Sequence, residues 1–147
     1  LAGRVYELMS FLVDVLDIKN ISGEFRSTFT YHDSCSGLRE LGIKKQPREL
    51  LSFIKDLTIE EYSGAETCCG FGGTFCIKYS DISAKIVSTR INELVSTNAD
   101  LVLGGDLGCL INLAGKLKRQ NSPIQVRHAA EVLAGLTDEP AIGEGEN

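Results

Sequence analysis

The sequence predicts an α/β fold in which a parallel sheet of about four strands is flanked by helices. Short runs rich in β-branched, aromatic and aliphatic residues alternate four times with segments whose apolar residues recur at helical spacing. Such alternation is typical of parallel strands joined by right-handed crossovers. A chain of 147 residues is also long enough to bury its own core as one compact domain.

The first strand is expected to follow an amphipathic segment. Apolar residues at helical spacing predict a helix over residues 4–18. The run FRSTFTY at residues 25–31 has the composition and alternation of a strand, and Phe25, Phe29 and Tyr31 would share one face. We therefore expect a helix and then a strand that leads toward the first cysteine.

Two helices and a second strand should come next. A short helix is expected from Cys35 through Leu41, because Gly42 then provides a helix stop. Pro47 suits the first turn of a further helix, since proline lacks the N–H that an interior helical position needs. The second strand is expected over residues 57–62, directly before a loop rich in cysteine and glycine.

The second half of the chain repeats the alternation. Ser80 is a good N-cap for a helix that runs to about residue 98. Residues 99–104, ADLVLG, form the clearest buried strand. The remaining expected elements are a helix opened by Cys109, a strand over residues 124–127 and a closing helix over residues 128–136.

Residues 137–147, TDEPAIGEGEN, differ in composition from the rest of the chain. The formal net charge is −5, and this segment holds four acidic residues and no basic one. Its low apolar content predicts a disordered acidic tail after a single domain at residues 1–136. The remaining, nearly neutral body suggests neither a nucleic-acid surface nor a polybasic membrane patch.

The hydropathy and the first residues of the chain bear on two questions, whether it spans a membrane and whether it is part of a longer protein. No apolar run approaches the roughly 18 residues that a membrane-spanning helix needs, so no membrane span is expected. The chain opens on Leu1 rather than Met, and the helix at residues 4–18 follows almost at once. We therefore expect the chain to be a piece of a longer protein.

Five cysteines carry the strongest functional signal. Their odd number, with no secretion signal, favours metal or redox chemistry over a disulfide framework. All but Cys76 come after a predicted strand, and ligands of open parallel sheets bind beyond the carboxyl ends of the strands. Cys76 lies past the loop and is taken as a bystander. The candidate metal ligands at this sheet edge are Cys35, Cys68, Cys69 and Cys109.

The stretch AETCCGFGGTFC suggests what these thiols bind. Adjacent cysteines suit an iron–sulfur cluster, in which neighbouring thiolates can reach different irons, whereas structural zinc sites usually take Cys-x2–4-Cys pairs. Gly70, Gly72 and Gly73 permit positive φ and a close backbone approach, so their N–H groups could point at an anionic centre. Zinc held by the same four thiolates is the alternative, and ordinary core packing of the thiols is a weaker one.

His32 is a further candidate beside the first cysteine. It could donate a hydrogen bond to a cluster sulfur, or bind the metal if a cysteine does not. A histidine that only satisfies a backbone carbonyl at the end of a strand is an equal alternative.

The motifs YHDSC, CCGFGG and GGDLGC, in this order and at these spacings, resemble the cysteine-rich CCG domain. This domain occurs in one subunit of heterodisulfide reductase, in the iron–sulfur subunit of glycolate oxidase and in the lactate utilization protein A family. The stretches LRELGI, QPRELL and HAAEVLAGL are most similar to the last of these. The likeness runs from about residue 5 to residue 136 and implies the C-terminal CCG half of such a protein.

The family pattern is a cysteine, then CCG, then CxxC, and Asn112 stands where the last cysteine would be. The resemblance implies an iron–sulfur cluster, with 4Fe–4S the expected type, held by the four cysteines named above. It also makes His32, Asn112 and the three loop glycines candidates for the surroundings of that cluster.

The function that the resemblance implies is electron transfer in a cytoplasmic complex that oxidises L-lactate or glycolate. The domain would not be catalytic alone. Its partners would be the other subunits, through which it could lie at the inner membrane, and the missing N-terminal half. A zinc-stabilised docking module is the alternative, and a thiol–disulfide switch ranks last because the chain has no CxxC pair.

Overall fold

The structure, a computed structural model, describes residues 4–145 and confirms the α/β class. Four parallel strands form one sheet in the order β2-β1-β3-β4. The strands are β1 (Glu24–His32), β2 (Lys55–Ile59), β3 (Leu101–Gly104) and β4 (Gln125–His128). The helices are α1 (Leu8–Ser10), η2 (Phe11–Val15), α2 (Cys35–Glu40), α3 (Lys45–Leu51), α4 (Thr74–Lys78), α5 (Ser80–Val95), α6 (Leu107–Arg119) and α7 (Ala129–Leu133).

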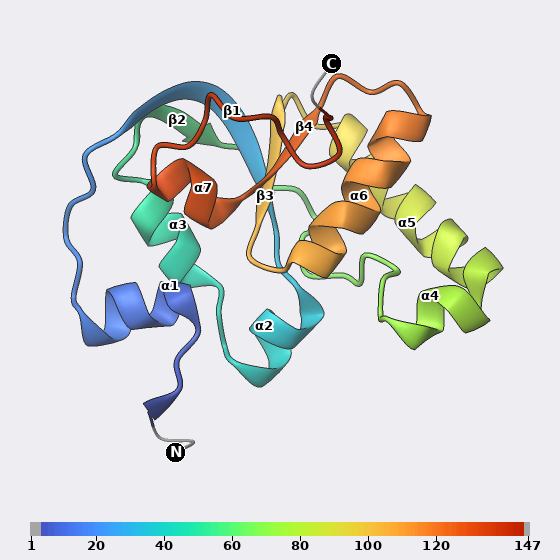
Figure 1. The fold of residues 1–147 in the computed structure, drawn as a ribbon, viewed down its shortest axis with the longest axis horizontal. Coiled ribbons are helices and arrows are strands. Elements are labelled where there is room, and N and C mark those ends of the chain that lie inside the picture. Colours follow the sequence, from blue (N-terminus) through green and yellow to red (C-terminus); the bar gives the residue numbers. More distant parts are fainter. Residues whose placement is uncertain (1–3, 146–147) are drawn as a thin grey trace.

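Helices cover both faces of the sheet, which gives the domain three layers (Figure 1). Successive strand residues point to opposite faces, and the core follows this alternation. Leu101 and Leu103 of β3 pack with α1, α3 and α7, whereas Val102 packs with α5 and α6. Tyr31 joins the first of these cores. Its neighbour His32 is fully buried, within 4.8 Å of cysteine sulfurs that belong to the second core.

The N-terminal helix is much shorter than its apolar spacing predicts. The expected helix over residues 4–18 is only α1 followed by one π-helical stretch, η2. The carboxylate of Glu7 accepts from the backbone N–H groups of Met9 and Ser10 and so begins the helix there. Asp17, with φ of 54°, ends it. Met9 is the side chain of this segment that is fully buried.

The second strand begins earlier than predicted and ends earlier as well. Lys55 pairs with Glu24 of β1, and the register shifts near Asp56, whose φ is 61°. Backbone pairing to β1, rather than apolar content, therefore sets the limits of this edge strand. As a result, residues 60–67 separate the strand from the cysteine pair, which we expected directly after it.

The segment after residue 136, for which composition predicts disorder, has defined contacts up to residue 145. Ala141 is buried, and Ile142 donates its N–H to the Val126 carbonyl at 2.9 Å and packs on the core beneath α6. The buried Arg127 guanidinium donates to the Glu139 carbonyl. This segment thus lies along β4, the edge strand, and gives its backbone and side chains partners that β3 alone cannot provide.

Candidate metal centre

The carboxyl ends of β1 and β3 bring chemically active residues together. His32 is the last residue of β1 and pairs with Gly104, the last residue of β3. Asp106 then caps α6, and its carboxylate accepts the N–H of Cys109 at 3.1 Å. Cys109 therefore lies in the first turn of α6, directly beyond the sheet edge. The loop that follows β2 brings Cys69 to the same place.

His32, Cys69 and Cys109 form the central group of this site, which we call the His–Cys–Cys group. Their potential ligand atoms all lie within 4.8 Å of one another. The three side chains are buried, with exposed fractions of 1%, 3% and 5% respectively. Residues far apart in the chain thus present one nitrogen and two sulfur donors to a common point inside the protein.

The other three thiols are placed differently. Cys35 opens α2 and is half-buried, while Cys68 is exposed and lines a shallow cleft against α5 with Ile86 and Arg90. The Sγ of Cys68 accepts the N–H of Gly70 at 3.3 Å. Cys76 lies in α4, and its thiol donates to the Gly73 carbonyl at 2.9 Å. The two adjacent cysteines therefore face different surroundings, and Cys69 is the buried one.

The two buried thiols shift each other's pKa in opposite directions. A hydrogen bond from the Cys109 thiol, with a further one from the Phe71 N–H, lowers the pKa of Cys69 to about 5, although burial opposes this. The same hydrogen bond, burial and the charges of Cys69, Asp106 and Cys35 raise the pKa of Cys109. At neutral pH the pair carries one negative charge, stabilised by short-range donors.

His32 is held at one ring nitrogen and open at the other. Its Nδ1 lies 3.4 Å from the hydroxyl oxygen of Tyr62, while its Nε2 has no hydrogen-bond partner within residues 4–145. Burial raises the pKa of the Tyr62 phenol, so this group is protonated at neutral pH. A buried nitrogen with no partner is rare in folded proteins and needs an explanation.

The loop glycines adopt the backbone that was expected of them. Gly70, Gly72 and Gly73 have φ values of 85°, 111° and 56°. At Gly70 a Cβ would lie 2.7 Å from the Ser83 carbonyl oxygen, and the Ser83 hydroxyl donates to the Gly70 carbonyl at 2.7 Å. Gly70 therefore lets the cysteine loop lie directly on α5, which fixes where Cys69 enters the interior.

Asn112 supports the cysteine pair from α6. Its side-chain amide nitrogen donates to the Cys69 carbonyl oxygen at 2.9 Å. The residue thus binds the backbone of the loop and positions Cys69, a role that its alignment with a cysteine of the family pattern did not suggest.

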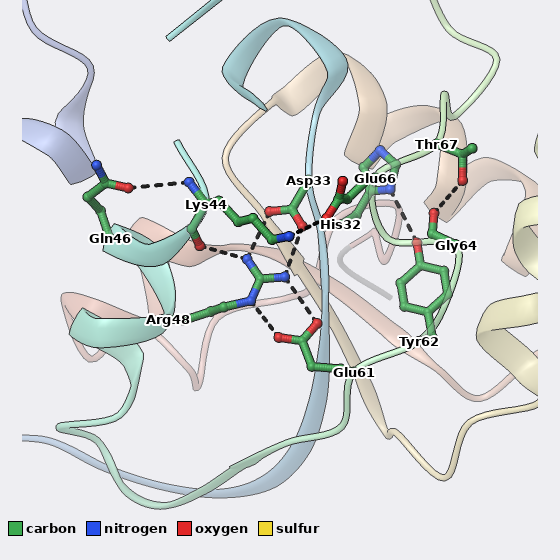
Figure 2. Close-up of polar contacts among 10 residues, drawn as sticks. All are labelled: His32, Asp33, Lys44, Gln46, Arg48, Glu61, Tyr62, Gly64, Glu66 and Thr67. Carbon is green, nitrogen blue, oxygen red and sulfur yellow. Dashed lines mark hydrogen bonds and ion pairs between the residues drawn. The ribbon is translucent and has the colours of Figure 1, made fainter. Parts of the chain in front are cut away.

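Arg48 of α3 joins the two segments that carry the donors, a contact that sequence reasoning missed. Its guanidinium donates to both carboxylate oxygens of Asp33 at 2.9 Å and to Glu61 at 3.1 Å (Figure 2). Asp33 follows His32, and Glu61 precedes Tyr62. Arg48 therefore binds the residues next to both members of the His32–Tyr62 contact. Arg39, which lies one helical turn after Cys35 in α2, is exposed instead.

A second arginine anchors the same loop from the other side. Arg90 of α5 is buried and donates to the Gly64 carbonyl at 2.6 Å and to Glu93 at 2.9 Å. The Asp33 N–H also donates to the Ala65 carbonyl at 3.1 Å. Arg48 and Arg90 both lie in helices that carry other charged residues, so the sequence offers no local signal that would have singled them out.

The donor set fits a metal centre. Thiolate and imidazole are the ligands of zinc and of iron–sulfur centres, and a ring nitrogen of His32 lies within 4.8 Å of both buried thiols. The structure does not place Cys35 or Cys68 within the 4.8 Å group, so the four-thiolate set expected from the sequence stays a prediction.

A parallel α/β domain with buried cysteines at the carboxyl edge of its sheet defines the class as a cysteine-rich domain with metal-ligand chemistry. The chain belongs to the CCG family, described as "Cysteine-rich domain", whose model matches residues 29–114. The resemblance noted from the sequence is thereby confirmed. No helix within the described residues is long and apolar enough to cross a membrane.

Curated relatives point to one branch of this family. The chain is 47% identical to "Lactate utilization protein A 2" of Bacillus cereus (strain Q1) over 91% of its length and 55% of the relative. It is 45% identical to "Lactate utilization protein A" of Geobacillus sp. (strain WCH70) over 90% of its length and 56% of the relative. The chain therefore spans about half the length of the relatives it matches. No solved structure matches it significantly.

Proposed function

We propose that this chain is an iron–sulfur electron-transfer domain of a protein that acts in lactate utilization. The observation that carries the proposal is the buried His–Cys–Cys group at the carboxyl edge of the sheet, within 4.8 Å. The names of the relatives support the lactate role, and the CCG family supports the use of cysteine ligands. A role in glycolate oxidation is the related alternative within the same chemistry.

The four thiolates proposed to hold the cluster are those of Cys35, Cys68, Cys69 and Cys109. Cys69 and Cys109 would provide buried ligands, and the other two ligands would come from Cys35, which is half-buried at the start of α2, and from Cys68, which is exposed in the loop. A cluster bound there would accept and release single electrons. The chain's own residues would hold it, and the backbone N–H of Phe71 would stabilise negative charge on the Cys69 sulfur.

The proposed partners follow from what the domain lacks. A domain that only transfers electrons needs another subunit to oxidise the 2-hydroxy acid and a further acceptor. The part of the lactate utilization relatives that this chain does not span is the proposed N-terminal half beside it. These partners belong to the same proposal.

Anaerobic purification of the chain tests the proposal. Iron, acid-labile sulfide and zinc are measured per chain, together with absorbance near ~400 nm, where thiolate–iron charge transfer is expected. Iron and sulfide with a brown colour support the proposal. Colourless protein without iron and sulfide after anaerobic reconstitution contradicts it.

A matched pair of variants locates the centre. We expect Cys69→Ser to lose the metal while the helix content in circular dichroism stays mostly intact, because the first core does not contain Cys69 and the second core is made mostly of aliphatic side chains. Cys76→Ser, in which the thiol of α4 is removed, should bind metal as the wild type does. Normal metal content in Cys69→Ser would show that the cysteine pair does not bind the centre.

Zinc in a structural site is the second candidate. It is favoured by one observation, which is that the donors closest together are two thiols and an imidazole, a combination common in zinc sites. Stoichiometric zinc without colour after strictly anaerobic handling would select this candidate over the cluster.

A further inference from the structure

We infer that His32 binds the metal centre directly, through Nε2. This inference deepens the proposed function, on which it rests for the presence of a metal, and it changes the ligand set. The cysteine motifs imply thiolates alone, whereas the structure puts an imidazole nitrogen into the tightest group of donors in the described chain.

The first argument is the environment of Nε2. The His32 side chain is 1% exposed, so water does not reach it freely, and Nε2 has no partner within residues 4–145. The same ring lies within 4.8 Å of the Cys69 and Cys109 sulfurs. A metal ion at this point would bind the nitrogen and both thiolates together. It would thereby remove the energetic cost of a buried nitrogen without a partner.

The second argument is that the other nitrogen is arranged for this role. Nδ1 lies 3.4 Å from the Tyr62 hydroxyl, which can accept its proton. Metal-binding histidines almost always donate the second ring N–H in this way, because the contact fixes the tautomer and the direction of the free lone pair. Arg48 in turn holds the backbone on both sides of this contact, through Asp33 beside His32 and Glu61 beside Tyr62.

The third argument comes from the second histidine of the chain. His128 also ends a strand at the same sheet edge, but both of its nitrogens are occupied. Its Nε2 lies 3.1 Å from the Gly105 carbonyl oxygen, and its Nδ1 accepts the N–H of Ala130 at 3.1 Å. His32 thus has a ring nitrogen without a hydrogen-bond partner and His128 does not, so His128 provides the control.

Zinc alone is the probe. The whole chain is stripped of metal, loaded with Zn²⁺ without oxygen and examined by X-ray absorption at the zinc edge. This method separates sulfur neighbours at about 2.3 Å from nitrogen at about 2.0–2.1 Å and detects the outer-shell scattering of an imidazole ring. We expect both sulfur and one imidazole in the wild type and in His128→Gln, and no imidazole in His32→Gln.

Zinc affinity, measured by competition with a chromophoric chelator, gives an independent readout. We expect a loss of more than about 100-fold in His32→Gln, a loss of about 10–100-fold in Tyr62→Phe, and no change in His128→Gln. If His32→Gln does not fold, the wild type and His128→Gln still decide the question, since the chain has two histidines.

An all-sulfur zinc site in the wild type, or an imidazole signal lost in His128→Gln, overturns the inference. So does a wild type that binds no zinc. These results are distinct from failure of the proposed function, which is decided by iron and sulfide after reconstitution. A zinc-bound imidazole without any iron–sulfur cluster supports the inference and contradicts the electron-transfer role.

Discussion

At the residue scale, the buried thiols of Cys69 and Cys109 favour one thiolate and one protonated thiol. Two sulfurs in contact cannot both ionise cheaply in a dry environment, so one proton stays between them. Cys109 acts as the donor, and the Phe71 N–H adds a second hydrogen bond that favours the thiolate of Cys69. The metal-free protein therefore already holds one thiolate in the place where a cation would bind.

This arrangement predicts the pH dependence of the metal-free chain. Cys69 should deprotonate near pH 5, well below the usual cysteine value of about 8.5. The unfolded chain binds more protons between these values, so stability should rise with pH from about 5 to about 8.5. Above that range the raised pKa of Cys109 reverses the sign, because the folded state then keeps a proton that the unfolded state has lost.

The ultraviolet absorbance of the thiolate against pH checks this expectation. Cys109→Ala removes the donor and should move the transition upward, and Cys76→Ser should leave it unchanged. Absence of any thiolate signal below pH 7 in the wild type would contradict the shared proton.

Gly70 is the second position where one residue decides local structure. Its φ is 85°, and a Cβ at this position would lie 2.7 Å from the Ser83 carbonyl oxygen, so a side chain requires the backbone to move. We expect Gly70→Ala to lower the free energy of unfolding by about 1–3 kcal/mol in urea denaturation. Gly105→Ala is the control, because φ there is ordinary and the nearest atom would lie at 3.4 Å. Equal stabilities of the two variants would show that the loop can leave α5 easily.

At the scale of the elements, Arg48 connects α3 with Asp33, directly after β1, and with Glu61, in the loop that follows β2. The side chain of Asp33 is 1% exposed and that of Arg48 is 19% exposed, so this ion pair is largely shielded from water. The arginine also stacks over the Tyr31 ring, with its guanidinium carbon 5.0 Å from the ring centroid. Burial lowers the pKa of Arg48, but the hydrogen bonds with Glu61 and Asp33 outweigh it and raise the pKa overall.

Arg48→Met should therefore cost about 3–5 kcal/mol of unfolding free energy, because it leaves a buried carboxylate without its partner. Arg48→Lys should recover part of this loss, since it keeps the charge without the two-pronged geometry. The control is Arg26→Met, whose side chain is 89% exposed and lies 3.9 Å from Asp56, and we expect a change within about 0.5 kcal/mol. Chemical denaturation measures all three, and a similar loss in Arg26→Met would show that position 48 is not special.

At the scale of the whole molecule, the acidic C-terminal segment completes the edge of the sheet. Lys118 of α6 donates to the Gly143 carbonyl at 2.7 Å, and Ile142 bonds to β4 and packs on the second core. The acidic side chains of the segment do not prevent this, because its apolar side chains and backbone groups make the contacts.

Removal of residues 137–147 should lower the unfolding free energy by about 2–4 kcal/mol, since Arg127 loses a carbonyl partner and the Ala141–Ile142 contact is lost. Ile142→Ala should account for about 1–2 kcal/mol of this. Ile77→Ala, at a position that is 81% exposed, should be nearly neutral. A truncated chain as stable as the full one in urea denaturation would mean that the segment is loosely attached in solution.

Prediction from sequence succeeded where the signal was local. The apolar run in ADLVLG and the helix expected from Cys35 are readable within a few residues, and β3 and α2 are where the pattern puts them. Ser80 was expected to cap the next helix, but it is the first residue of α5, and Tyr79 before it provides no side-chain cap. The helix over residues 4–18 failed because Glu7 and Asp17, which set its limits, are not strong signals alone. The strand over residues 57–62 was misplaced because its pairing with Glu24 is not local.

By itself, the sequence determined the α/β class, the succession of strands and helices along the chain and the cysteine-rich family, because periodicity and motif spacing are properties of neighbouring residues. Only the tertiary structure decided which donors meet. It buried Cys69 while leaving Cys68 exposed, and it brought His32 rather than Cys35 into the closest group. Adjacent residues in an irregular loop have no fixed period, so their directions depend on what packs around them, here α5, α6 and the two arginine anchors.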